Sequence, residues 1–206
     1  MAAPGWPAAL HEGRVGLRAL RTRDAGRWSE LRVRDQEWLE RWEGRPPGTP
    51  EVLWADRHSP TAYGVALRTW RREAKAGHCL PFGVTFDSRL VGQVTVMNIV
   101  RGAFNSGAVG YWVTSEVAGL GVMPTAVAML VDHCFSAVGL HRLEVNIRPD
   151  NAPSLRVVEK LGFRREALHE RYLYIDGAWR DHISFALTSE DVPDGLVERW
   201  RSSQNA

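Results

Sequence analysis

A glycine turn between a strand-like segment and a helix-like segment constrains the fold of this chain most strongly. Residues 108–114, AVGYWVT, have the pattern of a strand, and the chain then passes through Gly119 and Gly121 into apolar residues that recur at helical spacing up to Gly139. We expect the backbone amides of residues 120–123 to point at one spot on the positive end of the helix dipole, where proteins hold a pyrophosphate. The turn alone leaves open the alternative of a plain connection between strand and helix.

The rest of the chain also alternates between strand and helix patterns. The expected elements are a strand at 13–20, helices at 22–42 and about 60–76, a hairpin of strands at 80–86 and 90–100, the strand at 108–114, the helix after Gly121, a strand at 141–148, a short helix from Asn151 to Gly162, and a last hairpin of strands at 171–175 and 179–187. The order is strand, helix, helix, three strands, helix, strand, helix and two strands. This order predicts an α/β fold in one domain over residues 1–206.

Composition excludes several classes of protein. With 26 basic and 24 acidic side chains the net charge is +2, too balanced for the positive field that direct nucleic-acid binding needs. No apolar run approaches the roughly 20 residues of a membrane helix, and the first residues lack a signal pattern, so we expect a cytoplasmic protein without a membrane partner. Cys79 and Cys134 have neither disulfide-framework nor metal-ligand spacing and are expected to be buried thiols.

Several short motifs resemble those of one family. The motifs are NIVRGAF, GLGVM, HRLEVN, Asn151-x-x-Ser154, LGF and YLYIDGAWRDH. They are similar to the GCN5-related N-acetyltransferases (GNAT), and within them to the RimJ branch of ribosomal-protein alanine N-acetyltransferases. The family's pyrophosphate pattern is Q/R-x-x-G-x-G/A, in which Gly121 matches the central Gly while Ala118 and Met123 depart from the pattern. The resemblance spans about residues 13–190 and leaves a short N-terminal extension and a C-terminal tail.

The resemblance implies a GNAT fold, with a mixed, mostly antiparallel sheet whose fourth and fifth strands splay apart. It also implies acetyl-CoA as co-substrate and no metal. The pyrophosphate would lie on the glycine turn, and the pantetheine arm would bond to the unpaired backbone groups between the splayed strands. The residues expected to bind the coenzyme are Tyr111, Trp112, Val113, Gly119, Leu120, Gly121, Val122, Met123, Thr125, Asn151 and Ser154.

Acetyl transfer by direct attack needs a neutral amine, stabilisation of the thioester oxyanion, and a proton for the departing thiolate. The resemblance places Ser154 against the coenzyme sulfur as general acid, although a solvated serine at a helix start is the alternative. Asn151 is an N-cap whose amide can also donate to the coenzyme. Asn146 stands where some relatives carry a Glu, and it can hold a water that accepts the amine proton. Glu43 resembles a Trp-Glu pair of RimJ-type chains, with a helix-end carboxylate in water as the alternative.

The acceptor side is expected to be lined by aromatic and polar residues, with the N-terminal α-amine of a protein, by resemblance a ribosomal one, as acceptor. The expected acceptor-binding residues are Trp38, Trp42, Glu43, Asp181 and His182. A purely structural hydrogen bond is the alternative for His182. Two other functions stay open: a small-molecule amine acetyltransferase with a deep acidic pocket, and a non-catalytic domain that binds coenzyme A or the ribosome.

Overall fold

One mixed sheet forms the centre of the computed structural model, which describes residues 4–204. Its strands are β1 (Ala9–Glu12), β2 (Val15–Ala19), β3 (Leu80–Phe86), β4 (Arg89–Val100), β5 (Ser106–Val113), β6 (Arg142–Ile147), β7 (Arg164–Ile175) and β8 (Ala178–Thr188). They lie in the order β1-β2-β3-β4-β5-β6-β8-β7. Only β5 and β6 are parallel, which confirms the expected mixed, mostly antiparallel sheet.

The pairing between β5 and β6 is short. It joins Ser106 to Arg142, Gly107 to Leu143 and Ala108 to Glu144, and no pair follows. Beyond that point β5 continues along β4 to Val113, while β6 continues along β8 to Ile147. The two strands therefore separate as the resemblance implied, and their facing edges carry backbone groups without a strand partner.

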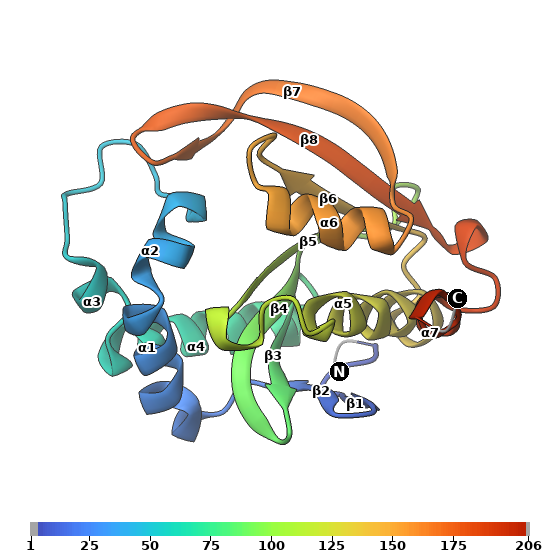
Figure 1. Ribbon diagram of the computed structural model, residues 1–206, viewed down its shortest axis with the longest axis horizontal. Helices are drawn as coiled ribbons and strands as arrows, with labels where there is room; N and C mark the ends of the chain where they lie inside the picture. Colours follow the sequence, from blue (N-terminus) through green and yellow to red (C-terminus); the bar gives the residue numbers. More distant parts are fainter. Residues whose placement is uncertain (1–3, 205–206) are drawn as a thin grey trace.

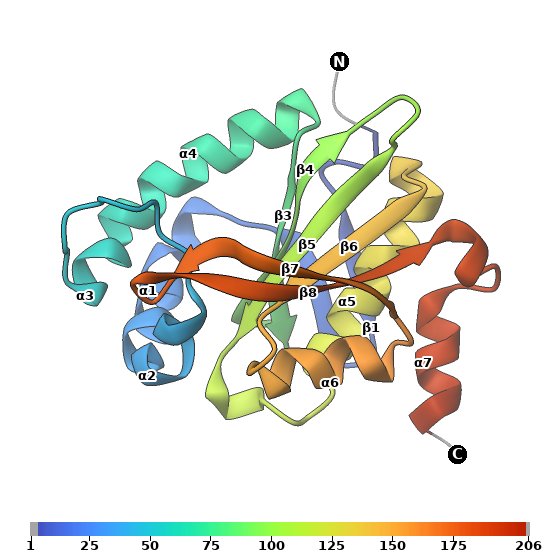
Figure 2. The same ribbon diagram turned by 90° about the horizontal axis from the view of Figure 1, so that it is seen from above.

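Helices cover the sheet in two groups. Their bounds are α1 (Ala25–Arg34), α2 (Gln36–Leu39), α3 (Trp54–Arg57), α4 (Pro60–Ala76), α5 (Val122–His133), α6 (Ala152–Lys160) and α7 (Leu196–Gln204). Figure 1 shows α1 to α4 together at one side of the molecule and α7 at the other. The long β7–β8 ribbon runs from the α7 side to the α2 side (Figure 2). The isolated bridge between Gly44 and Ile175 ties the ribbon to the loop after α2.

α5 is the most deeply buried helix, because apolar residues occupy almost its whole circumference. Val127, Leu130 and Val131 are fully buried in the main core beside residues of β2 to β6. Trp28 and Tyr63 belong to a second cluster, between α1 and α4. These helices hold the two sides of the β5–β6 gap at fixed positions.

Three expected elements differ in the structure. The expected helix at 22–42 is broken at Asp35 into α1 and α2, because the Asp35 carboxylate bonds to the end of β5. The expected strand at 13–20 is half of the β1–β2 hairpin. β7 begins at Arg164, well before the expected residue 171, because a bulge with a positive φ of 50° at Arg171 interrupts its pattern.

The C-terminal tail forms α7 and packs on α5. Leu196 and Trp200 are buried there. Asp132 of α5 accepts the first amides of α7, with 2.6 Å from Leu196 N to Oδ1 and 3.0 Å from Val197 N to Oδ2. Asp132 therefore acts as the N-cap of α7 from another helix.

We expect Asp132→Ala to lower the free energy of unfolding by about 1 kcal/mol, the usual contribution of a capping side chain. Urea denaturation followed by circular dichroism measures the change. Glu198→Ala, on the exposed face of α7, is the control and should change stability little. Equal stabilities of the two variants would contradict the capping role.

Candidate active site

A cavity of about 900 Å³ opens at the separation of β5 and β6. It extends from the turn before α5 and the start of α6, across the separated strands, to the loop after α2 and the β7–β8 ribbon. This volume is in the range of ligand sites. Consecutive residues of β5 and of β6 line it, and their side chains point alternately to the two faces of the sheet.

The turn before α5 offers unpaired donors. Gly119 and Gly121 have φ of 83° and 77°, which a side chain would strain. The amides of Gly119, Gly121, Val122 and Met123 have no hydrogen-bond partner within residues 4–204. The Leu120 amide instead donates to Val117 O at 3.3 Å. The free donors are therefore these four, and not the run from residue 120 to 123.

The start of α6 forms the next part of the wall. Asn151 Oδ1 accepts from Ser154 N at 3.2 Å, which confirms Asn151 as the N-cap. Ser154 lines the cavity, and its hydroxyl has no hydrogen bond to another described residue. Tyr111 Oη donates to Ser154 O at 3.3 Å, and burial raises the pKa of Tyr111, which keeps it a phenol. β5 and α6 are thus tied together beside Ser154.

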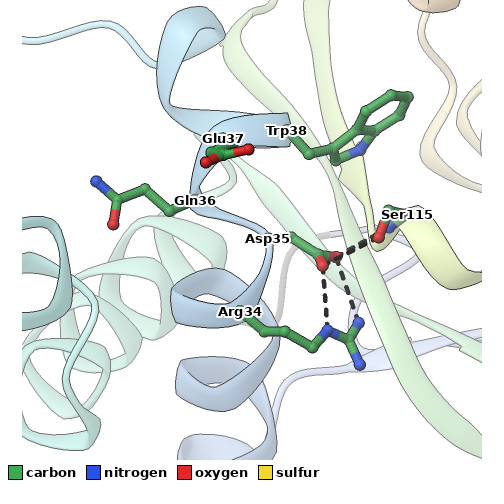
Figure 3. Close-up of a pocket in the computed structure, with 6 residues that line it drawn as sticks. All are labelled: Arg34, Asp35, Gln36, Glu37, Trp38 and Ser115. Carbon is green, nitrogen blue, oxygen red and sulfur yellow. Dashed lines mark hydrogen bonds and ion pairs between the residues drawn. The ribbon is translucent and has the colours of Figure 1, made fainter.

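Asp35 fixes the position of α1 at the end of β5. Its carboxylate accepts from Thr114 Oγ1 at 2.6 Å and from Ser115 N at 2.9 Å. Figure 3 shows it between Arg34 and Ser115, with Gln36 pointing away. Burial acts to raise the pKa of Asp35, but the bonds from Arg34, Thr114 and Ser115 outweigh it and lower the pKa. The carboxylate therefore stays charged and holds α1 against the end of β5.

The next turn places two tryptophans at the cavity. Trp38 Nε1 donates to Val113 O at 3.0 Å, which occupies that carbonyl at the edge of β5. Trp42 follows one turn later, where Arg148 lies 5.1 Å from its ring centroid. Both rings line the cavity on the side of the β7–β8 ribbon.

Glu43 belongs to a buried ion-pair cluster. It pairs with Arg32, and its Oε1 lies 3.7 Å from Arg57 Nη1. The Arg32 guanidinium lies within 5.5 Å of the ring centroids of three tryptophans: Trp28, Trp54 and Trp112. Burial, with a smaller effect of Arg57, lowers the pKa of Arg32 to about 9, so it stays protonated at neutral pH. The Glu43 carboxylate is therefore neutralised by cations where it meets the cavity.

His58 completes this cluster as a neutral imidazole. Its Nδ1 donates to Trp54 O at 2.9 Å, so Nε2 accepts from Arg32 Nη2 at 2.8 Å. Burial and then the charge of Arg32 lower the pKa of His58 to about 4. At neutral pH His58 is uncharged and orients Arg32.

A row of polar side chains crosses β6, β8 and β7. Ser184 Oγ donates to Asn146 Oδ1, so His169 Nε2 donates to Ser184 Oγ at 2.8 Å. His182 is buried and lines the cavity, and its Nδ1 donates to Arg180 O at 3.0 Å. Burial is the main cause that lowers the pKa of His182.

Most residues that the sequence singled out line the cavity. They are Trp38, Trp42, Glu43, Tyr111, Trp112, Val113, Gly119, Gly121, Val122, Met123, Asn146, Asn151, Ser154 and His182. Three do not line it: Leu120, Thr125 and Asp181. Leu120 points to solvent, the Thr125 hydroxyl donates to Gly121 O and accepts from Trp200, and exposed Asp181 accepts from the backbone of Arg171.

Arg32, which the sequence did not single out, is buried and lines the cavity. No pattern marks it, because its helix carries charges along its length and only packing brings three indoles around it. Cys79 and Cys134 are buried as expected, and burial raises their pKa to about 11 and about 12. Within residues 4–204, no group of three His, Cys, Asp or Glu is placed to hold a metal. No helix in that range is long and apolar enough to cross a membrane.

Comparison with known proteins agrees with this geometry. Residues 14–164 match the family model described as an acetyltransferase (GNAT) domain. The chain belongs to the GNAT acetyltransferase family. As its members do, it transfers acetyl from acetyl-CoA to an amine, and the expected GNAT fold is confirmed.

Three relatives show how far the similarity extends. The Escherichia coli [ribosomal protein uS5]-alanine N-acetyltransferase is 30% identical over 90% of this chain and 93% of that protein. The Bacillus subtilis protein "Probable N-acetyltransferase YjcK" is 38% identical over 51% of this chain, and the match spans only 58% of that protein. The structure of Mycobacterium smegmatis RimJ in complex with CoA-disulfide is 42% identical, with a TM-score of 0.92, and the match covers 99% of this chain and 98% of that one.

The neutral His58 makes stability depend on pH. Its folded pKa of about 4 lies below the unfolded value of 6.5, so the unfolded chain binds the proton more readily. The stabilisation is complete above pH 6.5 and is lost as pH falls towards 4, by at most about 3 kcal/mol. We expect His58→Gln to weaken this dependence in urea titrations between pH 7 and 4.5. His78→Gln, at an exposed site, is the control and should keep the wild-type slope; a His58→Gln slope equal to wild type would contradict this assignment.

Proposed function

We propose that this chain acetylates the N-terminal α-amine of a ribosomal protein, by direct attack of the amine on acetyl-CoA in a ternary complex. The observation that carries the proposal is the full-length similarity to RimJ of Mycobacterium smegmatis. The Escherichia coli relative is named for alanine of ribosomal protein uS5, so an N-terminal alanine is the acceptor we favour. Such a substrate implies action in the cytoplasm.

The chemistry of the acceptor side supports an α-amine over a lysine side chain. An α-amine has a pKa of about 7.7–8.0 and lysine about 10.4, a gap of about 2.5 units or roughly 3.5 kcal/mol in reaching the neutral form. The Glu43 carboxylate at the cavity is already paired with Arg32. A site without an unpaired carboxylate suits the amine that is easier to deprotonate.

The charges around the cavity argue against a polycationic small molecule as acceptor. Glu43 is the single carboxylate among the described lining residues. The cationic side chains there are Arg32, Arg45, Arg148, Arg156 and Lys160. An aminoglycoside or polyamine would meet repulsion, whereas the phosphates of coenzyme A would be attracted to Arg156 and Lys160 on α6.

We assign roles to the lining residues on this basis. The free amides from Gly119 to Met123 bind the pyrophosphate at the positive end of α5, and the unpaired edges of β5 and β6 bind the pantetheine arm. Ser154 protonates the departing thiolate. Trp38, Trp42 and Glu43 line the acceptor side, and Asn146 orients the amine or a water beside it.

A peptide with a free N-terminal Ala and an internal Lys tests the acceptor class. We expect acetyl on the α-amine after incubation with acetyl-CoA, located by fragmentation mass spectrometry. The same peptide with a blocked N-terminus is the control and should gain no acetyl. Acetyl on the lysine alone would refute the proposed acceptor, and release of no thiol with any amine would refute the enzyme activity.

The role of Ser154 is tested by Ser154→Ala, which keeps the backbone bond to Asn151. We expect turnover to fall about ten- to a hundredfold, the low end for a general acid, with little change in the affinity for acetyl-CoA. Steady-state kinetics with a thiol reagent, and calorimetry for acetyl-CoA, measure both. Ser136→Ala, outside the cavity, is the control. Unchanged turnover of Ser154→Ala would leave Ser154 with a structural role only.

A further inference from the structure

The roles above leave the proton of the acceptor amine without a base, and the row of polar groups on β6, β8 and β7 offers one. His182 and Ser184 lie two residues apart on β8, on one face of the sheet and about 7 Å from each other along the strand. Ser184 is paired with Asn146 across β6 and β8. His182 therefore lies near Asn146 on the same face, within reach of one bridging water.

The imidazole of His182 is oriented by a single bond. A carbonyl oxygen can only accept, so Nδ1 carries the proton that is donated to Arg180 O, and the lone pair of the neutral ring is on Nε2. Nε2 has no hydrogen-bond partner within residues 4–204. Among the described residues, the fully buried side-chain nitrogens and oxygens without a partner are Nε of Arg32 and Nε of Arg57. Nε2 of His182 is not one of them, so it keeps some exposure, and His182 lines the cavity.

The groups that face His182 keep it neutral. Burial lowers its pKa first, and the charges of Arg148 on the β6 side and of His169 on β7 act in the same direction. The Arg180 carbonyl and Asp181 oppose them, with the smaller effect. Tyr172 of β7 packs against the ring, with 5.7 Å between centroids. His182 is thus available as a base at neutral pH.

Two other candidates are less suited to this task. The Oδ1 atom of Asn146 already accepts the Ser184 hydroxyl. The rest of the Asn146 side-chain amide is an N–H₂ group, which donates and does not accept a proton. The Glu43 carboxylate is engaged by Arg32 and Arg57. Asn146 and Ser184, with His169 behind them, position the reacting groups instead of taking the proton.

We propose that Nε2 of His182 is the general base of this acetyltransferase. It accepts a proton from the acceptor ammonium, directly or through one water, and becomes an imidazolium that later releases this proton to solvent. The neutral amine attacks the thioester carbonyl, the C–N bond forms, and the C–S bond breaks. Ser154 gives its proton to the departing thiolate, and the second proton lost by the amine nitrogen restores the Ser154 hydroxyl. The amide and the thiol therefore leave as neutral products. The identity of the amine rests on the proposed function.

The experiment compares the pH dependence of kcat/KM for the acceptor in wild type and in His182→Asn. The Asn amide can keep the donor to Arg180 O while removing the base. In the wild type, His182 can remove the proton from a bound ammonium, so the protonated acceptor also reacts. We therefore expect the wild-type kcat/KM to be nearly independent of pH between pH 7 and the amine pKa of about 8. The variant can use only amine that is already neutral, so its kcat/KM should rise about fivefold between pH 7 and pH 8. We expect its kcat at pH 7 to be about a hundredfold lower, with the KM for acetyl-CoA unchanged.

One control, one second variant and one measurement distinguish a catalytic role of His182 from a structural role. His141→Gln, on an exposed histidine whose imidazole pairs with Glu190, should retain the wild-type profile. His182→Gln is the second variant if His182→Asn does not fold. Nitrogen NMR of the wild type should show the Nδ1–H tautomer of His182 with a pKa below 6.5.

A wild-type profile retained by both His182 variants would overturn the proposal, and so would a wild-type Nε2–H tautomer. Wild type that acetylates only lysine or a small amine would refute the proposed function instead. The same comparison of kcat/KM against pH, with that amine as acceptor, would then test His182 as the general base.

Discussion

The parallel pairing of β5 and β6 ends after Ala108 and Glu144, and the rest of the site depends on that separation. A sheet that continued to pair would bury its backbone groups and close the route between its faces. Here β5 stays paired with β4, and β6 stays paired with β8, so the other strand pairs remain intact. Backbone donors and acceptors are thereby held open in a rigid sheet, where they need no reorganisation when substrate binds.

The two sides of the gap are built by different means. On the side that we propose binds the coenzyme, the wall consists of backbone amides at the start of α5, where Gly119 and Gly121 provide the left-handed turn. On the proposed acceptor side, the wall consists of side chains held in place by residues far away in the chain. Asp35 breaks α1 from α2 by binding Thr114 and Ser115, and this break turns Trp38 and the residues after it towards the cavity.

Charge is distributed unevenly across the cavity. The cation of Arg32 is buried among three indoles and balanced by Glu43, while His58 stays neutral behind it. On the ribbon side, His182 lines the cavity, and its Nε2 has no hydrogen-bond partner among the described residues. In the proposed mechanism, a neutral His182 and a Glu43 carboxylate that is already paired suit an amine whose pKa is close to neutrality.

The sequence by itself determined the order of the main elements, the glycine turn into α5 and the N-cap at Asn151, because these depend on local periodicity and backbone conformation. It also carried the family motifs, which located most of the lining residues. Tertiary structure decided what local patterns do not encode: the break at Asp35, the burial of Arg32, the docking of α7 on Asp132, and the exclusion of Leu120, Thr125 and Asp181 from the cavity. Each of these depends on a partner far away in the chain, as Asp35 depends on Thr114. A histidine nitrogen that donates to a carbonyl oxygen leaves the lone pair of the neutral ring on the other nitrogen. Only the folded chain determines which nitrogen of His182 lies next to a carbonyl.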